Sequence, residues 1–389
     1  MSAYPLMHMA PANDTGFPVG CYLNRLTLTD FRNHANLRLE VSETAVVLVG
    51  PNGAGKTNIL EAISLLTPGR GMRGSRVNEI TRIGGAGGWA AAASVIGPLG
   101  ESQVGVGIDP GQVSHSRQVR VDGDAAKGQA SLAERFSALW LTPQMDGLFS
   151  GAAEERRRYL DRIVAASDPA HIGRVSSYRN AMRQRLSLLK SGTADVTWLD
   201  ALEAEMAGRA VAVAAARIET AALLDAAAAE GVTAFPRASV MVEGLIEGWL
   251  NEVPALEAED RMREVLAEER RHDAETGMTT SGPHRTDMVI FDRSRNMPAA
   301  VGSTGEQKAL LVSLTFASAR MIERTTGCAP ALLLDEVAAH FDPNRRHALF
   351  DEALALGGQV WVTGADKLQL SALDDRADWL CIGSDVPEQ

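Results

Sequence analysis

The sequence contains few cysteines, and this scarcity limits the kinds of site that it can form. Cys21, Cys328 and Cys381 lie far apart, and no C-x-x-C pair occurs among the 389 residues. Three separated thiols cannot supply a structural zinc site by themselves, and an odd number does not indicate a disulfide framework. This cysteine usage fits a reducing compartment, and we expect the protein to be cytoplasmic.

Long apolar runs are also missing. No stretch of about 18 apolar residues occurs, so we expect no membrane span. Residues 1–20 contain several prolines but no apolar core of a signal peptide, and we expect a disordered tail there. No heptad pattern persists for many turns, which excludes a long coiled coil. The hydrophobic content of 45% and the charged content of 22% are typical of a globular protein.

The charge of the chain is unevenly distributed. The formal net charge of −11 argues against a nucleic-acid partner if it is taken as an average. However, residues 156–190 contain nine Arg and Lys against two Asp, a net charge of +7, whereas residues 191–277 contain 18 acidic residues against seven Arg, a net charge of −11. A basic segment therefore precedes an acidic one, and the average hides it.

A phosphate-binding loop is the clearest motif in the chain. The β-branched run 46–49 predicts a buried strand, and the periodic apolar residues of 59–66 predict a helix. Between them the pattern G-x-x-x-x-G-K-[ST] is satisfied by Gly50, Pro51, Asn52, Gly53, Ala54, Gly55, Lys56 and Thr57. The glycines allow close approach to a phosphate, Lys56 adds a positive charge, and the Thr57 hydroxyl can bind Mg²⁺. This segment predicts a site for a nucleoside triphosphate.

The succession of strands and helices predicts an α/β protein with a helical insertion. Alternating patterns predict short strands through the first 150 residues, and helical windows rich in Ala, Arg, Glu and Leu follow to about residue 229. Strands, including 288–291, then alternate with helices, which is typical of a parallel sheet. We therefore expect a tail at 1–20, a β-rich head lobe at 21–150, a compact helical arm at 151–277, and a second head lobe at 278–389.

A second apolar strand, at 331–334, ends in two carboxylates. In a phosphate-loop protein a carboxylate in the place of Asp335 holds Mg²⁺ through water. Glu336 follows it and could deprotonate the water that attacks the terminal phosphate. Ser303 and Gly305 begin the preceding helix, where they form either an ordinary helix cap or a second anion-accepting site.

These segments resemble the ABC ATPase superfamily. Ser303, Gly305 and Gln307 resemble its signature, and Asp342 resembles the acidic residue of its D-loop. The resemblance implies an ABC-type ATPase head in which the signature of one copy contacts the γ-phosphate bound by another copy. It therefore implies a homodimer that forms on ATP binding. Thr363 stands where transporter members often have histidine, which implies slow hydrolysis.

Within this superfamily the sequence is similar to the RecF family of bacterial recombinational-repair proteins. The similarity rests on the segments 31–34, 58–63, 156–161 and 282–287, which occur in the family's order. It implies ATP and Mg²⁺ as cofactors, Arg32 and Asn33 as further nucleotide-binding residues, and Lys56 and Glu336 as the residues of hydrolysis. It also implies duplex or junction DNA and mediators of the RecR and RecO types as partners.

Two arginine-rich segments are candidates for contact with DNA. A glycine-rich loop contains Arg70, Arg73 and Arg76, and the basic segment contains Arg156, Arg157, Arg158, Arg179 and Arg183. Arginine contacts phosphate and gives DNA binding that depends on salt. A solvated side chain or an ion pair with the acidic segment remains an alternative for each of them.

The leading hypothesis is an ATP-dependent DNA-binding protein of recombinational repair and replication restart, which dimerises on ATP and hydrolyses it slowly. A soluble ATPase subunit of a membrane transporter would share the nucleotide site, although Lys56 and Ser303 lie 247 positions apart here, much farther than in such subunits. A scaffold that uses ATP only to hold a dimer would show no turnover. Both alternatives remain open on the residues alone.

Overall fold

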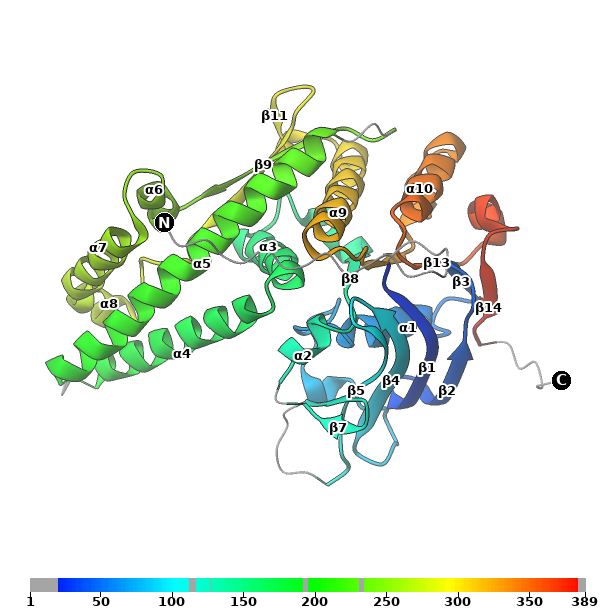
Figure 1. The fold of residues 1–389 in the computed structure, drawn as a ribbon, viewed down its shortest axis with the longest axis horizontal. Helices are drawn as coiled ribbons and strands as arrows, with labels where there is room; N and C mark the ends of the chain where they lie inside the picture. Colours follow the sequence, from blue (N-terminus) through cyan, green and yellow to red (C-terminus); the bar gives the residue numbers. More distant parts are fainter. Residues whose placement is uncertain (1–19, 112–116, 127, 192–194, 231–233, 384–389) are drawn as a thin grey trace. The chain divides into compact units, whose positions relative to one another are not determined.

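The protein divides into two compact units, which are described separately (Figure 1). The computed structural model describes residues 20–111, 117–126, 128–191, 195–230 and 234–383. One unit comprises Met1–Pro143 and Ala319–Gln389, and the other comprises Gln144–Ser318. The expected tail lies, except for Gly20, outside the described residues. The predicted arm is contained in the second unit, but the predicted boundary at 278 falls inside this unit.

An antiparallel sheet of six strands occupies much of the first unit. Its strands are β1 (Tyr22–Phe31), β2 (His34–Glu40), β4 (Trp89–Gly97), β5 (Gly100–Ile108), β6 (Gln118–Val121) and β7 (Asp124–Ala125). They pair in the order β2-β1-β4-β5-β6-β7. Phe31 and Trp89 pack edge to face, with ring centroids 5.5 Å apart, so the alternating apolar residues predicted from the sequence form a core face of this sheet.

A parallel sheet of five strands carries the phosphate-binding loop. Its strands are β3 (Ala45–Val49), β8 (Ala138–Leu141), β12 (Ala331–Asp335), β13 (Val360–Gly364) and β14 (Asp378–Cys381), in the order β14-β3-β13-β12-β8. Every residue of β3, β8, β12 and β13 is buried, as expected of parallel strands covered on both faces. Because the strands run in the same direction, the segments that follow β3 and β12 emerge at one edge.

Short helices complete the first unit. They are α1 (Lys56–Leu65), α2 (Ala130–Ala133), α10 (Pro343–Ala355) and the 3₁₀ turns η1 (Val77–Glu79), η4 (Val337–His340) and η5 (Lys367–Leu373). The periodic apolar residues of this segment, Ile59, Ala62, Ile63 and Leu66, are completely buried at α1.

Helices dominate the second unit. They are α3 (Ala153–Ser167), α4 (Ala170–Lys190), α5 (Val196–Glu230), α6 (Leu245–Leu250), α7 (Ala255–Glu268), α8 (Arg270–Thr276) and α9 (Thr304–Thr326), with the turns η2 (Pro143–Gly147) and η3 (Ala299–Val301). The residues of α9 from Ala319 onward, and Pro143 of η2, are assigned to the first unit. The 35 residues of α5 span about 50 Å at 1.5 Å per residue. Its high alanine content favours an uninterrupted helix.

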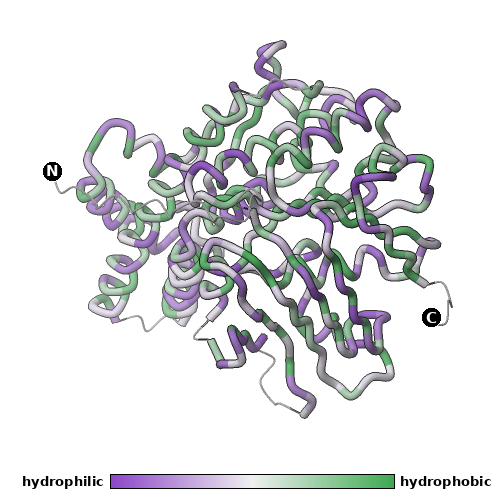
Figure 2. The backbone as a smooth tube through the Cα atoms, turned by 45° about the vertical axis from the view of Figure 1, so that its right-hand side comes forward, coloured by the Kyte–Doolittle hydropathy of each residue, from purple (hydrophilic) through white to green (hydrophobic). Residues whose placement is uncertain are grey.

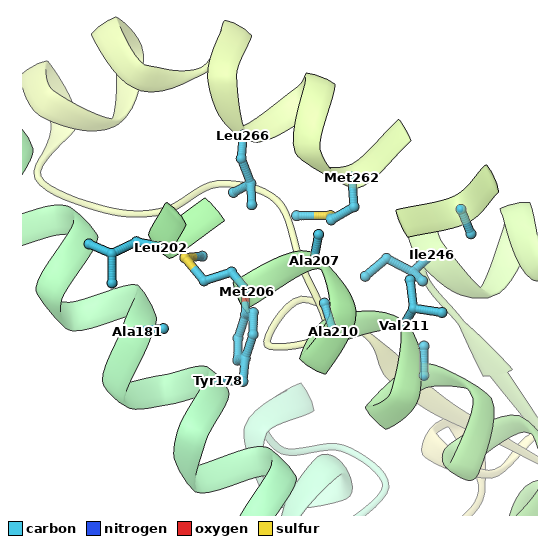
Figure 3. Close-up of a cluster of buried hydrophobic side chains, with 12 residues drawn as sticks. Tyr178, Ala181, Leu202, Met206, Ala207, Ala210, Val211, Ile246, Met262 and Leu266 are labelled. Atoms are coloured by element: carbon cyan, nitrogen blue, oxygen red, sulfur yellow. The ribbon is translucent and has the colours of Figure 1, made fainter. Parts of the chain in front are cut away.

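The core of the helical arm lies between α4, α5, α6 and α7 (Figure 3). Leu202, Met206 and Ala210 lie on one face of α5 at i, i+4 spacing, and they are at most 6% exposed. Met262 of α7 and Ile246 of α6 are completely buried against this cluster. The periodic stripe is thus a packing face.

A small antiparallel sheet in the second unit corrects one prediction. Its strands are β9 (Ala238–Glu243), β10 (Asp287–Asp292) and β11 (Met297–Pro298), in the order β11-β10-β9. We expected 288–291 to belong to the parallel sheet, but β10 pairs antiparallel to β9, a strand that the helical context of the sequence concealed. A strand pattern indicates an extended segment but does not identify its partner.

Hydrophilic and hydrophobic residues alternate along the helices instead of forming long apolar segments (Figure 2). Among the described residues, no helix is long and apolar enough to span a membrane. Amphipathic helices of this kind pack one side against a core and leave the other in solvent.

Candidate nucleotide site

The loop between β3 and α1 has the conformation that its glycines permit. Gly50, Gly53 and Gly55 have φ of 153°, 83° and 102°, values that other residues rarely adopt. A Cβ on Gly55 would lie 2.5 Å from Nε2 of His34 and 2.6 Å from Oδ1 of Asn33. Glycine is therefore required there both for backbone conformation and for space.

Lys56 holds its positive charge inside this loop. Its side chain is buried, and Nζ donates to the carbonyl oxygens of Gly50 at 2.8 Å and Pro51 at 3.0 Å. Neither partner carries a charge, and no ion pair joins Lys56 to a carboxylate within the described residues. An ammonium group at the N-terminus of α1 is suited to a phosphate, because both the charge and the helix end attract an anion.

The end of β12 lies against the phosphate-binding loop. Thr57 Oγ1 donates to Oδ1 of Asp335 at 2.9 Å, and Thr363 Oγ1, from β13, donates to the same oxygen at 2.8 Å. These contacts bring together residues separated by 278 positions in the chain. A hydroxyl and a carboxylate oxygen at this place are the ligands that Mg²⁺ takes beside nucleotide phosphates, so the residues fit this ion.

Glu336 follows Asp335 in a left-handed conformation, with φ of 52°. Its backbone N–H donates to Thr363 Oγ1 at 3.0 Å, so Thr363 positions both carboxylate residues. The Glu336 side chain is exposed, and its carboxylate has no hydrogen-bond partner in the described part of the chain. Because the backbone of Glu336 is fixed and its carboxylate oxygens are exposed, the side chain can accept a proton from water.

A buried carboxylate on α1 holds two neighbouring loops, although it was not among the predicted site residues. Glu61 is 1% exposed, and its two oxygens accept hydrogen bonds from Arg32 at 2.9 and 2.5 Å. Arg73 donates to the same carboxylate at 3.1 Å. Arg32 was predicted to bind nucleotide and Arg73 to bind DNA, but both guanidinium groups are engaged by Glu61 in this structure. Arg70 and Arg76, on the same loop, are exposed.

Asn33 contacts the phosphate-binding loop directly. Its Nδ2 donates to the carbonyl oxygen of Ala54 at 3.1 Å, and its Oδ1 accepts from Nδ2 of Asn58 at 2.7 Å. His34 Nε2 lies 3.3 Å from the carbonyl oxygen of Gly55. The turn between β1 and β2 thus supports the loop from the side.

The predicted signature residues lie in the second unit, at the start of α9. Ser303 Oγ accepts from the backbone N–H of Glu306 at 3.4 Å, while Oε2 of Glu306 accepts from the backbone N–H of Ser303 at 2.8 Å and from its hydroxyl at 3.0 Å. This arrangement is a capping box. A carboxylate therefore lies at the helix N-terminus where we expected a phosphate. The hydrogen bond from Arg295, together with those from Ser303, lowers the pKa of Glu306 to about 2.

The remaining residues of the predicted dimer face have local structural partners. Gln307 Nε2 donates to the carbonyl oxygens of Ala300 at 3.1 Å and Gly302 at 2.9 Å, so its amide fixes the turn before α9. Gly305 has no heavy atom within 4 Å of the place of a Cβ. Asp342, in the first unit, caps α10 by accepting from the N–H of Arg345 at 3.1 Å.

The arginine run of the predicted DNA surface is partly internal. Arg156 forms two hydrogen bonds of 2.8 Å with Asp287, and its side chain is 14% exposed. Arg157 donates to the carbonyl oxygen of Thr286 at 2.6 Å. Arg158 pairs with Glu154 one turn away, and this pair is exposed. Arg156 is therefore a structural residue, because its guanidinium group already has a carboxylate partner, Asp287, whose side chain is 32% exposed.

The other two candidates of this surface lie on α4. Arg179 and Arg183 are exposed, and Arg183 donates to Oδ1 of Asn180. Neither forms an ion pair within the described residues. They retain the exposure that a contact with DNA requires.

The sequence is similar to known proteins that share one name. Residues 22–376 match the family described as RecF/RecN/SMC N terminal domain. The DNA replication and repair protein RecF of Rhizobium etli is 48% identical over 362 residues, which cover 92% of this chain and 96% of the relative. The protein of the same name from Rhizobium meliloti is 44% identical over 369 residues, with 94% and 98% coverage.

Solved structures share the fold. The structure described as the recombination mediator protein RecF-ATPrS in the RecFOR pathway superimposes with a TM-score of 0.80 at 23% identity. It covers 91% of this chain and 95% of the other. The structure described as RecF-ATP gives the same TM-score at 22% identity. At these identities the likeness concerns the fold.

Proposed function

Because the chain belongs to the RecF family, we propose that it is an ATP-dependent DNA-binding protein of DNA replication and repair. The observation that carries this proposal is the 2.9 Å contact between Thr57 and Asp335. It joins the loop 50–57 to the end of β12, which supports a site that binds a triphosphate and hydrolyses it. A protein that acts on chromosomal DNA is expected in the cytoplasm.

In the proposed site, the backbone of the loop 50–57 and the ammonium group of Lys56 bind the β- and γ-phosphates. The carbonyl oxygens that now accept from Lys56 are exchanged for phosphate oxygens. Thr57 and Asp335 would hold Mg²⁺, which neutralises charge on the phosphates when it is bound. Glu336 orients a water molecule and takes its proton as the water oxygen bonds to the γ-phosphorus, while the bond from this phosphorus to the β–γ bridging oxygen breaks and ADP leaves.

A second copy of the chain completes the proposed cycle. Ser303 and the N-terminus of α9 would contact the γ-phosphate held by Lys56 of the other copy, after Glu306 leaves its position in the capping box. The ATP-bound pair would hold DNA, and hydrolysis would release it. Thr363 in place of histidine supports slow hydrolysis, because its hydroxyl is engaged by Asp335 and Glu336. Mediators of the RecR and RecO types are proposed as further partners.

The transporter alternative is not favoured. The relatives that cover nearly the whole chain are DNA replication and repair proteins, and a coupling subunit would need a membrane partner. A scaffold in which ATP only holds two copies together would have the same nucleotide site. Only a measurement of ATP turnover distinguishes it from the proposed ATPase.

Phosphate release by the wild-type chain and by Glu336→Gln, with and without duplex DNA, tests the hydrolysis step. We expect slow release by the wild type and a loss of roughly 10²- to 10⁴-fold in the variant, the range contributed by a general base. Glu40→Gln, an exposed carboxylate on β2, should retain wild-type turnover. Equal rates for wild type and Glu336→Gln would reject this assignment of the base, and no turnover by the wild type under any condition would support the scaffold.

A further inference from the structure

The turn formed by residues 282–287 in the second unit is fixed by side chains from several helices. The backbone N–H of Arg285 donates to the carbonyl oxygen of Gly282 at 2.9 Å and closes the turn. The carbonyl oxygen of Pro283 accepts from Nη1 of Arg217, on α5, at 2.5 Å. The carbonyl oxygen of Thr286 accepts from Nη1 of Arg157, on α3, at 2.6 Å. The backbone of the turn is therefore held in one conformation.

The side chains of this turn are held as well. Thr286 Oγ1 donates to Glu247, on α6, at 2.7 Å, and Asp287 accepts two hydrogen bonds from Arg156. The hydroxyl oxygen of Tyr178, on α4, lies 2.8 Å from Nδ1 of His284. A Cβ on Gly282 would lie 2.1 Å from the same hydroxyl oxygen, so this position admits only glycine.

Arg285 is the exception in this turn. Its side chain is exposed and forms no hydrogen bond or ion pair with any residue that the structure describes. Four helices thus fix the turn that carries this guanidinium group: α3 and α5 bond to its backbone, and α4 and α6 to its side chains. A rigid support lowers the entropy cost of placing a binding group, so such a turn suits a residue that contacts a ligand.

Arg157 adds a second positive charge beside this turn. Its guanidinium group donates to the carbonyl oxygen of Thr286 but pairs with no carboxylate in the described chain, and burial together with the nearby charge of Arg217 lowers its pKa. The nearby carboxylates already have partners, because Asp287 pairs with Arg156, Asp161 with Arg217 and Glu154 with Arg158. Arg157 is about half-buried, so it remains accessible from solvent on one side.

His284 contributes no charge that would change this balance. Its Nε2 lies 2.9 Å from the carbonyl oxygen of Thr279, which can only accept, so Nε2 carries the hydrogen. Nδ1 then accepts from the hydroxyl of Tyr178. Burial lowers the pKa of His284, and the charges of Arg285 and Arg157 lower it further. The neutral imidazole satisfies both contacts, and the two arginines remain the uncompensated charges of the turn.

We propose that Arg285 and Arg157 form an anion site that takes a phosphate of the DNA backbone. This inference rests on the proposed DNA-binding function and names where the second unit contacts its ligand. A phosphodiester offers only acceptor oxygens, and the planar fork of a guanidinium group matches their geometry. The site reads no base, so it fixes the position of the duplex and not its sequence.

Binding of a short duplex, measured by fluorescence anisotropy over a range of salt concentrations, tests the site. We expect Arg285→Ala to weaken binding by roughly tenfold, the effect of one hydrogen bond to a charged group, and to reduce the slope of log K against log salt by about 0.9. The matched control is Arg271→Ala, which removes the same charge from an exposed arginine of the same unit that pairs with Glu275. Arg285→Lys should give an intermediate loss, because it keeps the charge without the fork.

Unchanged affinity and slope in Arg285→Ala would overturn the proposal. An equal loss in Arg271→Ala would also overturn it, since the effect would then follow net charge alone. Because Arg285 is exposed and bonds only through its backbone, its replacement should leave the thermal midpoint unchanged. If Arg285→Ala binds duplex DNA as the wild type does but binds an acidic protein less tightly, the site binds a protein and the DNA assignment is wrong.

Chemical modification tests the anion site separately from the proposed DNA-binding function. Phenylglyoxal labels exposed arginines, and mass spectrometry locates the labels. Duplex DNA should protect Arg285 and leave Arg271 reactive. If the wild type binds no DNA, the proposed function fails, and protection of Arg285 by tripolyphosphate then decides the anion site separately. Equal labelling of Arg285 with and without tripolyphosphate would reject the site.

Discussion

The charged residues at the ends of β3 and β12 and those in the core of the helical arm serve different purposes. In the first unit, Lys56 donates hydrogen bonds to two carbonyl oxygens of its own loop, and the carboxylate of Glu336 is exposed. In the second unit, Arg185 is completely buried and donates to Glu203 at 2.8 Å, to Asp273 at 2.6 Å and to the carbonyl oxygen of Leu266 at 2.6 Å. Lys56 and Glu336 thus have no oppositely charged partner among the described residues, whereas the arm uses many of its charges to join helices.

The largest expected effect concerns Arg185, the buried arginine that joins helices of the arm. Arg185→Leu would leave Asp273 buried without its cation, and we expect the free energy of unfolding to fall by about 3–5 kcal/mol. Urea denaturation followed by circular dichroism measures the loss. Arg263→Leu is the control, because Arg263 pairs with Asp260 at the surface, and its removal should cost less than about 1 kcal/mol. Similar losses in the two variants would remove the contrast between buried and exposed pairs.

The next effect concerns Lys56, in the first unit, which forms no ion pair within the described residues. Lys56→Ala removes the ammonium group that would bind the β- and γ-phosphates, and we expect ATP affinity to fall roughly 10- to 100-fold, the effect of losing about 1.5–3 kcal/mol of charged hydrogen bonding. Isothermal titration calorimetry measures the affinity. Lys190→Ala, an exposed lysine of the arm, should bind ATP as the wild type does. ATP binding by Lys56→Ala at wild-type strength would contradict the phosphate-loop assignment.

The sequence predicts the charge in the loop 50–57 better than it predicts the ion pairs inside the second unit. The loop 50–57 is a local motif between a strand and a helix, so its conformation followed from residue order. The pair of Arg156 with Asp287 joins positions 131 residues apart, and nothing local in the arginine run distinguishes it from an exposed one. The basic segment was therefore predicted as a surface, although two of its arginines, Arg156 and Arg185, are engaged inside the second unit.

Glu61 could have been found from the sequence. It stands between Leu60 and Ala62 on a helix whose neighbouring positions are buried, and a carboxylate in such a place needs a cationic partner. Its partners could not be identified, because Arg32 and Arg73 approach from a turn and a loop whose folding is not periodic. The strand β9 was missed for a related reason, since its partner β10 follows it only after three helices.

A smaller effect depends on pH. Burial would raise the pKa of Asp161, but hydrogen bonds from His171 and Arg217 outweigh it and hold the pKa at about 2, below the ordinary value of 3.8. A lowered pKa stabilises the folded state above the unfolded value, and this stabilisation, about 2 kcal/mol, is lost as the pH falls from about 4 to about 2. Asp161→Asn should therefore lower the stability at pH 7, and its difference from wild type should shrink below about pH 4. Urea denaturation between pH 7 and pH 3 measures it, and a difference independent of pH would contradict the ion pair.

The smallest effect concerns the start of α9. Glu306→Gln retains a capping box but removes the negative charge beside Ser303, where the γ-phosphate of another copy would lie. We expect the ATP-dependent dimer to become about two- to fivefold tighter, the range of one charge at a helix end. Sedimentation velocity at several protein concentrations measures the dimer affinity. A weaker dimer in Glu306→Gln would mean that this carboxylate supports the interface.

The most direct test of the account is the molar mass of Glu336→Gln with Mg²⁺ and ATP, measured by light scattering after gel filtration. The variant should bind ATP without hydrolysing it, so we predict a mass of twice the 41.4 kDa of one chain with ATP and the mass of a single chain without it. Adding Lys56→Ala to the variant should restore the single-chain mass. A mass of 41.4 kDa for Glu336→Gln with saturating ATP would contradict a nucleotide site that joins two copies.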